Sequence, residues 1–251
     1  MSVEAEEAQE KGGLKDTIRV VIHALILALI VRIFLFQPFN IPSGSMIPTL
    51  LVGDYLFVAK YSYGYSRYSF PFGPNIFSGR IWAAEPKPGD VVVFKLPRDN
   101  ETDYIKRVIG LPGDEIQMIH GVLHINGVPV KKEKISDFVM RDSSGRERHL
   151  ARYMETLPNG VSYPVLDLVK DGIGDNTEVY KVPENHFFMM GDNRDNSTDS
   201  RFLSEVGFVP FENLLGKAKI IFFSIDEDAS FWQVWKWPTD VRWSRILQTV
   251  H

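Results

Sequence analysis

The chain has 251 residues, a formal net charge of −4, 44% hydrophobic residues and no cysteine. The apolar fraction excludes a largely disordered chain, and the acidic balance disfavours nucleic acid as the main partner, which requires a basic face. The lack of cysteine excludes disulfide scaffolds, thiol nucleophiles and cysteine-ligated metal centres.

The N-terminal part differs from the rest of the chain. Residues 1–17 are rich in Glu and Lys and predict a polar cytoplasmic tail, whereas residues 18–36 form an apolar run that predicts a transmembrane helix. A span needs about 20 mostly apolar residues. The alternatives are a buried core helix, a surface amphipathic helix, which apolar residues on nearly every face disfavour, and a cleavable signal peptide, which lacks an adjacent small-x-small site. An N terminus in the cytoplasm is favoured by the basic residues before the run: Lys11, Lys15 and Arg19.

The remainder predicts a mainly β fold. Apolar runs bounded by turn residues predict strands at 91–94, 103–109, 115–120, 122–126, 186–190 and 217–224. No long amphipathic helix follows the apolar run, which favours a twisted antiparallel sheet or a partly open barrel. A polar, charged stretch predicts a β-rich insertion. The expected units after the span are core residues 37–130, the insertion 131–181, core residues 182–225 and a Trp-rich tail, 226–251.

Two candidate nucleophiles stand in a loop that follows the apolar run. Ser43 and Ser45 flank a glycine, although serine, glycine and proline are also ordinary turn residues. A serine nucleophile needs a base, and no histidine lies in a run with a catalytic pattern: His23, His120, His124, His149, His186 and His251. A Ser-His-Asp triad stays open at this point, because triads are defined in space.

Lys106 is the other candidate base. It lies in the predicted strand 103–109, where alternation places it on one face with Tyr104 and Val108 and away from Asp103. Burial disfavours the charged ammonium and would leave a neutral amine that accepts a serine proton near pH 7. The alternative is an edge-strand lysine that reaches solvent and pairs with Asp103.

A dense polar run occupies residues 190–201, directly after an apolar strand. A calcium loop is disfavoured because Ser200 and Val206 stand where that motif requires Gly and Glu. A polar network that supports a buried site is the better interpretation, with Asp199 and Arg201 as an ion pair. We expect neither a metal nor a cofactor.

Together these segments resemble the bacterial type I signal peptidases, the membrane-anchored leader peptidases. The motifs that carry the resemblance are SGSMIPTL at 43–50, PGDVVVF at 88–94, DYIKRVIGLPGD at 103–114 and GDNRDNSTDSR at 191–201. They occur in the family's order and spacing. The resemblance covers the span and about 37–120 and 182–225, and is weak in the insertion. The chain departs from the best-known pattern in having one span rather than two and extra residues at 202–206.

The resemblance implies roles for particular residues. Ser45 would be the nucleophile and Lys106 the general base, while the Ser43 hydroxyl and the Ser45 backbone N–H would bind the oxyanion. Ser197 would hold the lysine amine in place. Asp199 and Arg201 match a structural ion pair. The candidate walls of a shallow apolar pocket are Ile41, Met46, Leu50, Tyr104 and Ile105.

The implied protein is a serine endopeptidase of the bacterial inner membrane, with its catalytic part outside the cytoplasm. It would remove signal peptides from exported preproteins after small-x-small sites, such as Ala-x-Ala, through an acyl-enzyme. Its expected partners are preprotein signal peptides and the lipid bilayer, without nucleic acid. The alternatives are a self-cleaving Ser/Lys protein of the repressor type, an organelle processing peptidase, and a membrane-tethered β-domain that binds extracytoplasmic partners without catalysis.

Two aromatic clusters fall outside these motifs. One occupies residues 61–72, and the other comprises Trp232, Trp235, Trp237 and Trp243. Because Trp and Tyr favour the bilayer interface, we hypothesise that one or both clusters rest on the membrane. Packing onto the sheet is the alternative.

Overall fold

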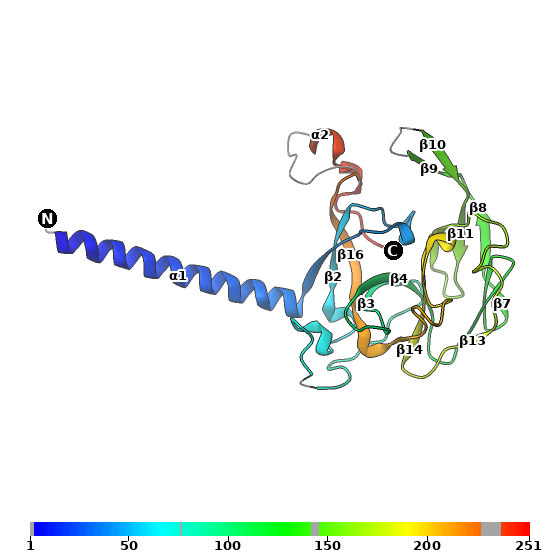
Figure 1. The fold of residues 1–251 in the computed structure, drawn as a ribbon, viewed down its shortest axis with the longest axis horizontal. Coiled ribbons are helices and arrows are strands. Elements are labelled where there is room, and N and C mark those ends of the chain that lie inside the picture. The colour runs from blue at the N-terminus through cyan, green and yellow to red at the C-terminus, as the bar shows by residue number, and fades with distance from the viewer. Residues whose placement is uncertain (1–2, 76, 142–145, 227–236) are drawn as a thin grey trace.

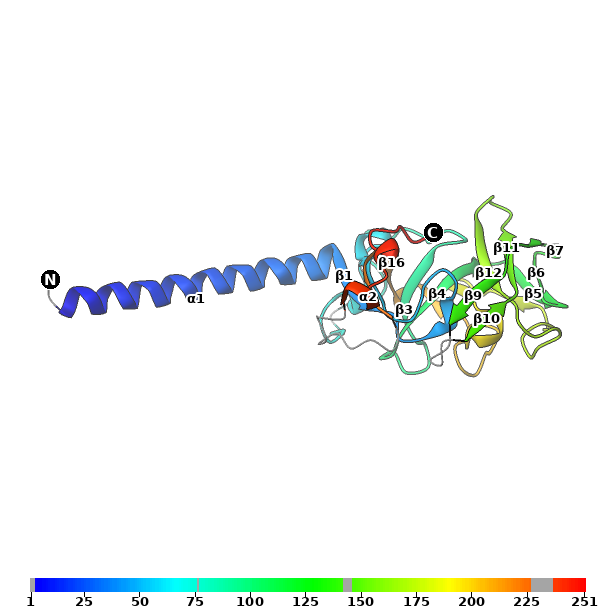
Figure 2. The same cartoon turned by 90° about the horizontal axis from the view of Figure 1, so that it is seen from above.

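The computed structural model describes residues 3–75, 77–141, 146–226 and 237–251. A long helix projects from one end of a β body (Figures 1 and 2), which confirms the predicted mainly β fold with an N-terminal apolar helix. The helices are α1 (Val3–Phe34) and α2 (Trp237–Asp240). The strands are β1 (Phe36–Asn40), β2 (Asp54–Ala59), β3 (Val91–Lys95), β4 (Asp103–Gly110), β5 (Glu115–Ile119), β6 (Val122–Ile125), β7 (Val128–Pro129), β8 (Lys131–Lys134), β9 (Phe138–Arg141), β10 (Glu147–Leu150), β11 (Arg152–Thr156), β12 (Ser162–Leu166), β13 (Tyr180–Lys181), β14 (His186–Met190), β15 (Val209–Pro210) and β16 (Leu214–Ser224).

Helix α1 contains a segment that is long and apolar enough to cross a membrane. Gly13–Phe34 has a mean hydropathy of 2.2 over its apolar window, and none of that window is buried in the protein. Residues 3–17, predicted as part of a polar tail, belong to this helix, because α1 already begins at Val3. Ala, Glu, Gln and Lys are strong helix formers, so this polar stretch extends the helix. The helix ends at Phe34, shortly before Pro38 in β1.

The main sheet has seven strands in the order β1-β2-β16-β3-β4-β14-β15. Its central strands are buried on both faces. Val91 and Val93 of β3 belong to one apolar cluster with Leu50, whereas Val92 and Phe94 belong to another. This accounts for the continuous apolar run of β3, which lacks the alternation of a half-exposed strand.

The backbone edges of this sheet that stay unpaired within the described residues include those of β1 and of the first half of β4. Strand β1 pairs only with β2, through residues 36–40. Strand β4 pairs with β3 along 103–107, but with β14 only from Arg107 onward. The first half of β4 and one side of β1 therefore offer free backbone N–H and C=O groups.

The predicted insertion is made of small antiparallel sheets on the side of the body away from α1 (Figure 1). It shares an apolar cluster with the main sheet. Tyr163 and Val165 of β12 pack in the same cluster as Ile109 of β4 and Met190 of β14. The insertion is thus attached to the strands that carry the polar motifs.

The C-terminal segment, predicted as a tail, lies along β16. Backbone N–H groups of Leu247 and Val250 donate to carbonyls of β16, at Ile221 and Lys219. Trp237 packs against Phe223 with ring centroids 5.5 Å apart. Sheet packing thus accounts for this tryptophan, while Trp243 is exposed and Trp232 and Trp235 lie outside the described residues.

We expect the β body to fold without α1. The helix meets it only at its C-terminal end, where the Tyr65 hydroxyl donates to the Phe34 carbonyl at 2.8 Å and the two rings lie 5.6 Å apart. A chain lacking residues 1–33 should melt cooperatively, with a Tm within ~3 °C of the full chain. Circular dichroism of both proteins in the same detergent checks this. A non-cooperative melt of the shorter chain would contradict it.

Candidate active site

Ser45 and Lys106 come together at the centre of the β body. Ser45 lies in a short 3₁₀ turn, Gly44–Met46, after β1, and Lys106 lies in the middle of β4. The Lys106 Nζ is 2.6 Å from the Ser45 Oγ. The Ser45 Oγ also lies 3.5 Å from the Ser43 Oγ. Ser45 is 7% exposed and Lys106 4%, so bulk water is excluded from the pair.

Burial lowers the pKa of Lys106 from 10.5 to about 8, and the more distant carboxylates of Asp199 and Asp192 limit the fall. A neutral amine is therefore accessible near neutral pH. The alternative pairing with Asp103 is wrong, because that carboxylate lies 2.8 Å from Lys95. The lysine thus faces the serine hydroxyl instead of solvent.

No histidine contacts Ser45 among the described residues. His120 lies on the surface, 3.1 Å from Asp171, and the imidazole of His186 contacts the Glu184 carbonyl. The two side-chain partners of the Ser45 hydroxyl are Lys106 and Ser43. The local geometry therefore favours an amine over an imidazole as the base.

A groove of about 500 Å³ leads to the Ser45 hydroxyl. Its walls come from the free edges of β1 and β4, with residues 39–45 on one side and 102–106 on the other. The predicted walls Ile41, Tyr104 and Ile105 line it. Met46 and Leu50 do not, because both are fully buried in the apolar cluster beneath it. Phe39 and Val93, which the sequence analysis missed, complete the apolar lining.

The polar run 190–201 packs against the loop that carries Ser45. Asp199 and Arg201 form the predicted ion pair, with the Arg201 Nε 2.9 Å from the carboxylate. Burial alone would raise the pKa of Asp199, but Arg201 and the backbone N–H of Gly191 hold it below its ordinary value. The pair is completely enclosed, so the carboxylate stays charged near the lysine.

Ser197 lies beside Gly191, and its hydroxyl is buried without a hydrogen bond to a described residue. Its predicted bond to the Lys106 amine is absent from this arrangement. A Cβ at Gly191 would overlap both the Ser197 side chain and the Ser45 carbonyl. Gly191 thus permits the close approach of the two serine segments, a role that the sequence analysis missed.

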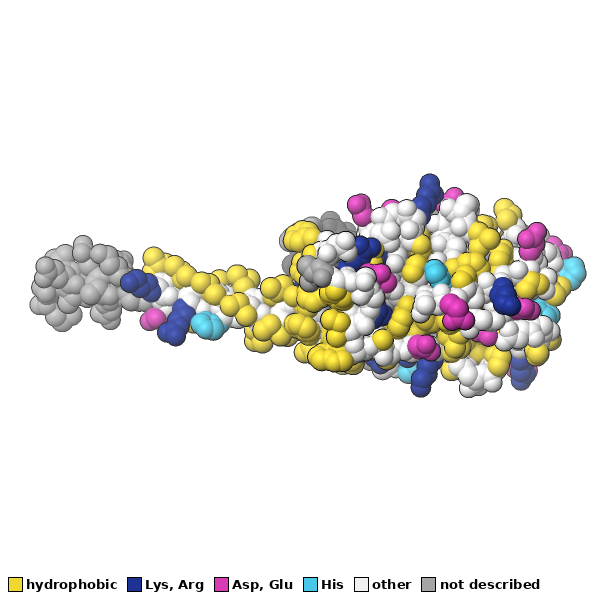
Figure 3. All heavy atoms as spheres, turned by 90° about the horizontal axis from the view of Figure 1, so that it is seen from below, with side chains coloured by type: hydrophobic (Ala, Val, Ile, Leu, Met, Phe, Trp, Pro, Cys, Tyr) yellow, Lys and Arg dark blue, Asp and Glu magenta, His cyan; other side chains and the backbone are white. Residues whose placement is uncertain are grey.

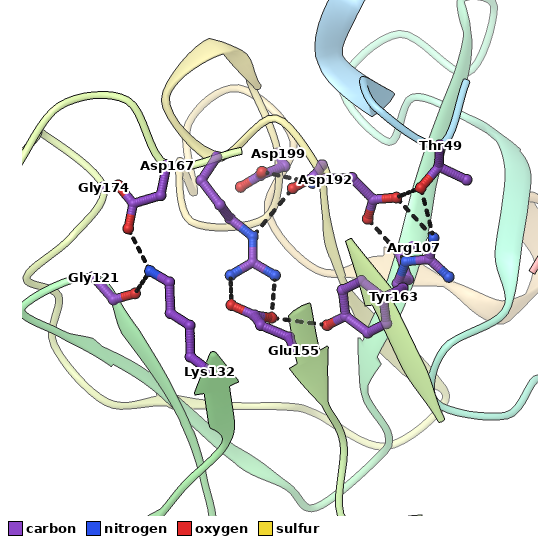
Figure 4. Close-up of polar contacts among 12 residues, drawn as sticks. Thr49, Arg107, Gly121, Lys132, Glu155, Tyr163, Asp167, Gly174, Asp192 and Asp199 are labelled. Carbon is purple, nitrogen blue, oxygen red and sulfur yellow. Dashed lines mark hydrogen bonds and ion pairs between the residues drawn. The ribbon is translucent and has the colours of Figure 1, made fainter. Parts of the chain in front are cut away.

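Asp192 and Asn193 fix the serine loop directly. The Asn193 backbone N–H donates to the Ser45 carbonyl at 3.0 Å, and its side chain donates to the Gly44 carbonyl at 3.0 Å. The Asp192 carboxylate accepts from Arg107 at 2.7 Å and from the Thr49 hydroxyl at 2.5 Å (Figure 4). The missed signal was Arg107, a second basic residue directly after Lys106 in β4.

The chain matches the family model described as signal peptidase, peptidase S26, over residues 14–223. The chain belongs to the signal peptidase family. Signal peptidase I of Rickettsia canadensis is 42% identical over 90% of this chain and 89% of that protein. Signal peptidase I of Rickettsia typhi is 42% identical over 90% of each chain. A crystal structure of a signal peptidase I from Enterococcus faecalis is 26% identical over 53% of this chain and 97% of that one, with a TM-score of 0.33.

Membership makes this signal peptidase a serine endopeptidase, a hydrolase that removes signal peptides. The non-catalytic β-domain is thereby excluded, and so is the self-cleaving repressor type. The apolar helix fits membrane anchoring. The matched residues run through the insertion, where the motif resemblance was weak.

The insertion of this signal peptidase holds the polar loop 190–201 through a buried ion pair. The two terminal guanidinium nitrogens of Arg194 each lie 2.6 Å from a carboxylate oxygen of Glu155 in β11. The Tyr163 hydroxyl donates to the same carboxylate at 3.1 Å (Figure 4). On the other side, Arg201 donates to the Arg194 carbonyl at 2.6 Å. Glu155 lies outside the main sheet, and through this ion pair it fixes the loop that carries Ser197.

One acidic cluster in the described residues has the spacing of a metal site. Carboxylate oxygens of Asp167, Asp175 and Asp195 lie within 4.8 Å of one another. The Lys132 ammonium bonds to Asp167 and to the Gly121 carbonyl (Figure 4). The cluster therefore already contains a counter-ion, and it lies outside the groove.

We expect Glu155→Gln to destabilise the protein and slow cleavage. It leaves the Arg194 charge buried without its carboxylate, which costs roughly 3–5 kcal/mol and lowers the Tm by ~10 °C. The matched control is Glu133→Gln, on neighbouring β8, whose ion pair with Lys131 is exposed. That control should change stability by less than about 1 kcal/mol. Thermal melts that shift equally for both variants would contradict this role of Glu155.

Proposed function

We propose that this signal peptidase cleaves preproteins with Ser45 as nucleophile and Lys106 as general base, through an acyl-enzyme. The observation that carries the proposal is the 2.6 Å contact between the Lys106 Nζ and the Ser45 Oγ. The pKa of about 8 supports it, because burial keeps part of the lysine neutral and able to accept a proton.

The proposed reaction has two halves. Neutral Lys106 accepts the Ser45 hydroxyl proton as the oxygen attacks the scissile carbonyl, and the ammonium then protonates the leaving amine. This yields a peptide ester on Ser45 and frees the mature protein. Lys106 next takes a proton from water, which attacks the ester, and the ammonium returns that proton to the Ser45 oxygen as the ester C–O bond breaks and the signal peptide leaves with a free carboxylate.

The oxyanion is proposed to accept hydrogen bonds from the Ser43 hydroxyl and the Ser45 backbone N–H. Ser43 is exposed at the groove, and its Oγ is 3.5 Å from the Ser45 Oγ. One such donor is worth roughly 3–4 kcal/mol of activation energy. Asp199 and Arg201 are proposed to hold the loop behind the lysine amine.

The substrate is proposed to enter as an extended strand between β1 and β4. Both strands offer free backbone groups to the groove, which suits β-strand addition. Apolar walls from Ile41, Tyr104 and Ile105 leave shallow space beside Ser45. Small residues would fit there, which supports cleavage after small-x-small sites.

The proposed topology places the N terminus in the cytoplasm and the β body on the outer side of the bacterial inner membrane. Basic residues before the span support this orientation. The proposed units are the tail 1–17, the span 18–36, the catalytic core 37–130 and 182–225, the insertion 131–181 and the C-terminal segment 226–251. The partners are exported preproteins and the lipid bilayer.

Substitution of either proposed catalytic residue should abolish preprotein cleavage. We expect Ser45→Ala and Lys106→Met to reduce kcat by at least ~1,000-fold, because the nucleophile and base act as a unit. Lys106→Met should also raise the free energy of unfolding, by up to about 3 kcal/mol at pH 7 for a pKa lowered from 10.5 to about 8. Cleavage of a purified preprotein in detergent measures the first effect, and thermal melts measure the second.

The control for that experiment is Lys131→Met, which removes an exposed lysine in β8 and should keep full activity. Near-normal cleavage by Lys106→Met would refute the lysine base. Cleavage at sites with large residues by the wild-type enzyme would refute the proposed specificity while leaving the dyad intact.

The pH profile should follow the neutral form of Lys106. The folded-state pKa is about 8, so kcat/KM should rise by about tenfold per pH unit below 8 and level off above it. Steady-state cleavage of a soluble signal peptide between pH 6 and pH 9.5 measures the profile. A midpoint near 6.5 would point to a histidine instead.

A further inference from the structure

A second pocket, of about 540 Å³, lies where α1 meets the β body. Cationic side chains reach it from separate elements: Arg32 from the last turn of α1, Lys60 and Arg67 from the segment after β2, and Lys95 from β3. The catalytic mechanism uses none of these residues.

Lys60 is the most unusual of them. It is only 2% exposed, and its Nζ donates to the Ser69 carbonyl at 2.7 Å, its one side-chain hydrogen bond among the described residues. An ammonium has three donors, so two remain for a ligand. Burial, aided by Arg32, lowers its pKa to about 8, so it is still mostly charged at pH 7. Keeping a charge enclosed in this way is costly unless an anion meets it.

Two of the other cationic side chains in the pocket already have acidic partners. Lys95 pairs with Asp103 at 2.8 Å, and Arg67 lies 3.4 Å from Glu212. Arg32 has no ion pair among the described residues. Asp99 and Glu101 also line the pocket. The charges of Arg32 and Lys60, which have no ion pair among the described residues, therefore suit one small anion, and Arg67 lines the same pocket.

The pocket lies at the level of the bilayer surface if α1 crosses the membrane. The Lys60 backbone N–H donates to the Leu35 carbonyl at 3.0 Å, directly after the apolar helix. Phe72, which also lines the pocket, is fully exposed. Hydrophobic side chains run along α1 and continue onto the adjoining end of the β body (Figure 3). An acyl chain attached to a ligand in the pocket would therefore have an apolar path along the helix.

We propose that this pocket binds the phosphate of a phospholipid headgroup, through Arg32, Lys60 and Arg67. The proposal rests on α1 crossing the membrane and is independent of the Ser45–Lys106 mechanism. A phosphodiester carries a single negative charge and several acceptor oxygens, which match cations converging from different elements. Free phosphate shares this chemistry, but the exposed aromatic residue and the adjoining apolar helix favour the lipid. Asp103 lines both this pocket and the groove, so the bound lipid would lie beside the substrate.

The test is native mass spectrometry of the full chain released from neutral detergent micelles containing phosphatidylglycerol. The wild type should retain one lipid, and diacylglycerol, which lacks the phosphate, should not be retained. Lys60→Met and Arg67→Gln should each weaken retention by about tenfold, the effect expected for loss of a charge-assisted hydrogen bond. The matched control is Lys131→Met, at the far side of the body from α1, which should retain lipid like the wild type.

Circular dichroism melts establish that each variant is folded, and Arg67→Gln keeps the test decisive if Lys60→Met does not fold. Equal retention by wild type and both pocket variants would overturn the proposal. Displacement of the lipid by millimolar inorganic phosphate, or binding of phosphate without retained lipid, would overturn the lipid assignment. Preprotein cleavage is a separate readout, so failure of the catalytic proposal leaves this result unchanged.

Discussion

The structure of this signal peptidase is organised around one buried lysine amine beside one serine hydroxyl. An amine in that position must be kept from water, since solvent would restore the ordinary pKa of 10.5. The surrounding apolar clusters and the central position of β4 supply that exclusion. The same burial costs folding free energy, which the rest of the fold offsets.

Three buried ion pairs lie around the Ser45–Lys106 pair. Arg107 with Asp192, Arg194 with Glu155, and Arg201 with Asp199 are all almost completely enclosed. Buried ion pairs often add little net stability, but they define geometry because a misplaced partner leaves a bare charge. Here they connect β4, the polar loop and the insertion. The insertion therefore serves the catalytic geometry although it lies outside the groove.

The membrane side of the molecule imposes a different constraint. The apolar helix leads directly into β1, and β1 forms one wall of the groove. An anchored enzyme thus presents its groove close to the point where its own chain leaves the bilayer. The cationic pocket lies at the same junction and shares Asp103 with the groove.

The sequence alone determined the apolar helix, most strands of the main sheet and the segments that carry polar chemistry. These features depend on local periodicity and on residue types at short spacing, so they can be read without the fold. The tertiary structure decided that Lys106 faces Ser45 and not Asp103, and that Met46 and Leu50 lie beneath the groove. It also brought Glu155 to Arg194 from a remote part of the chain. Burial and charge pairing depend on contacts between distant segments, and no local pattern encodes them.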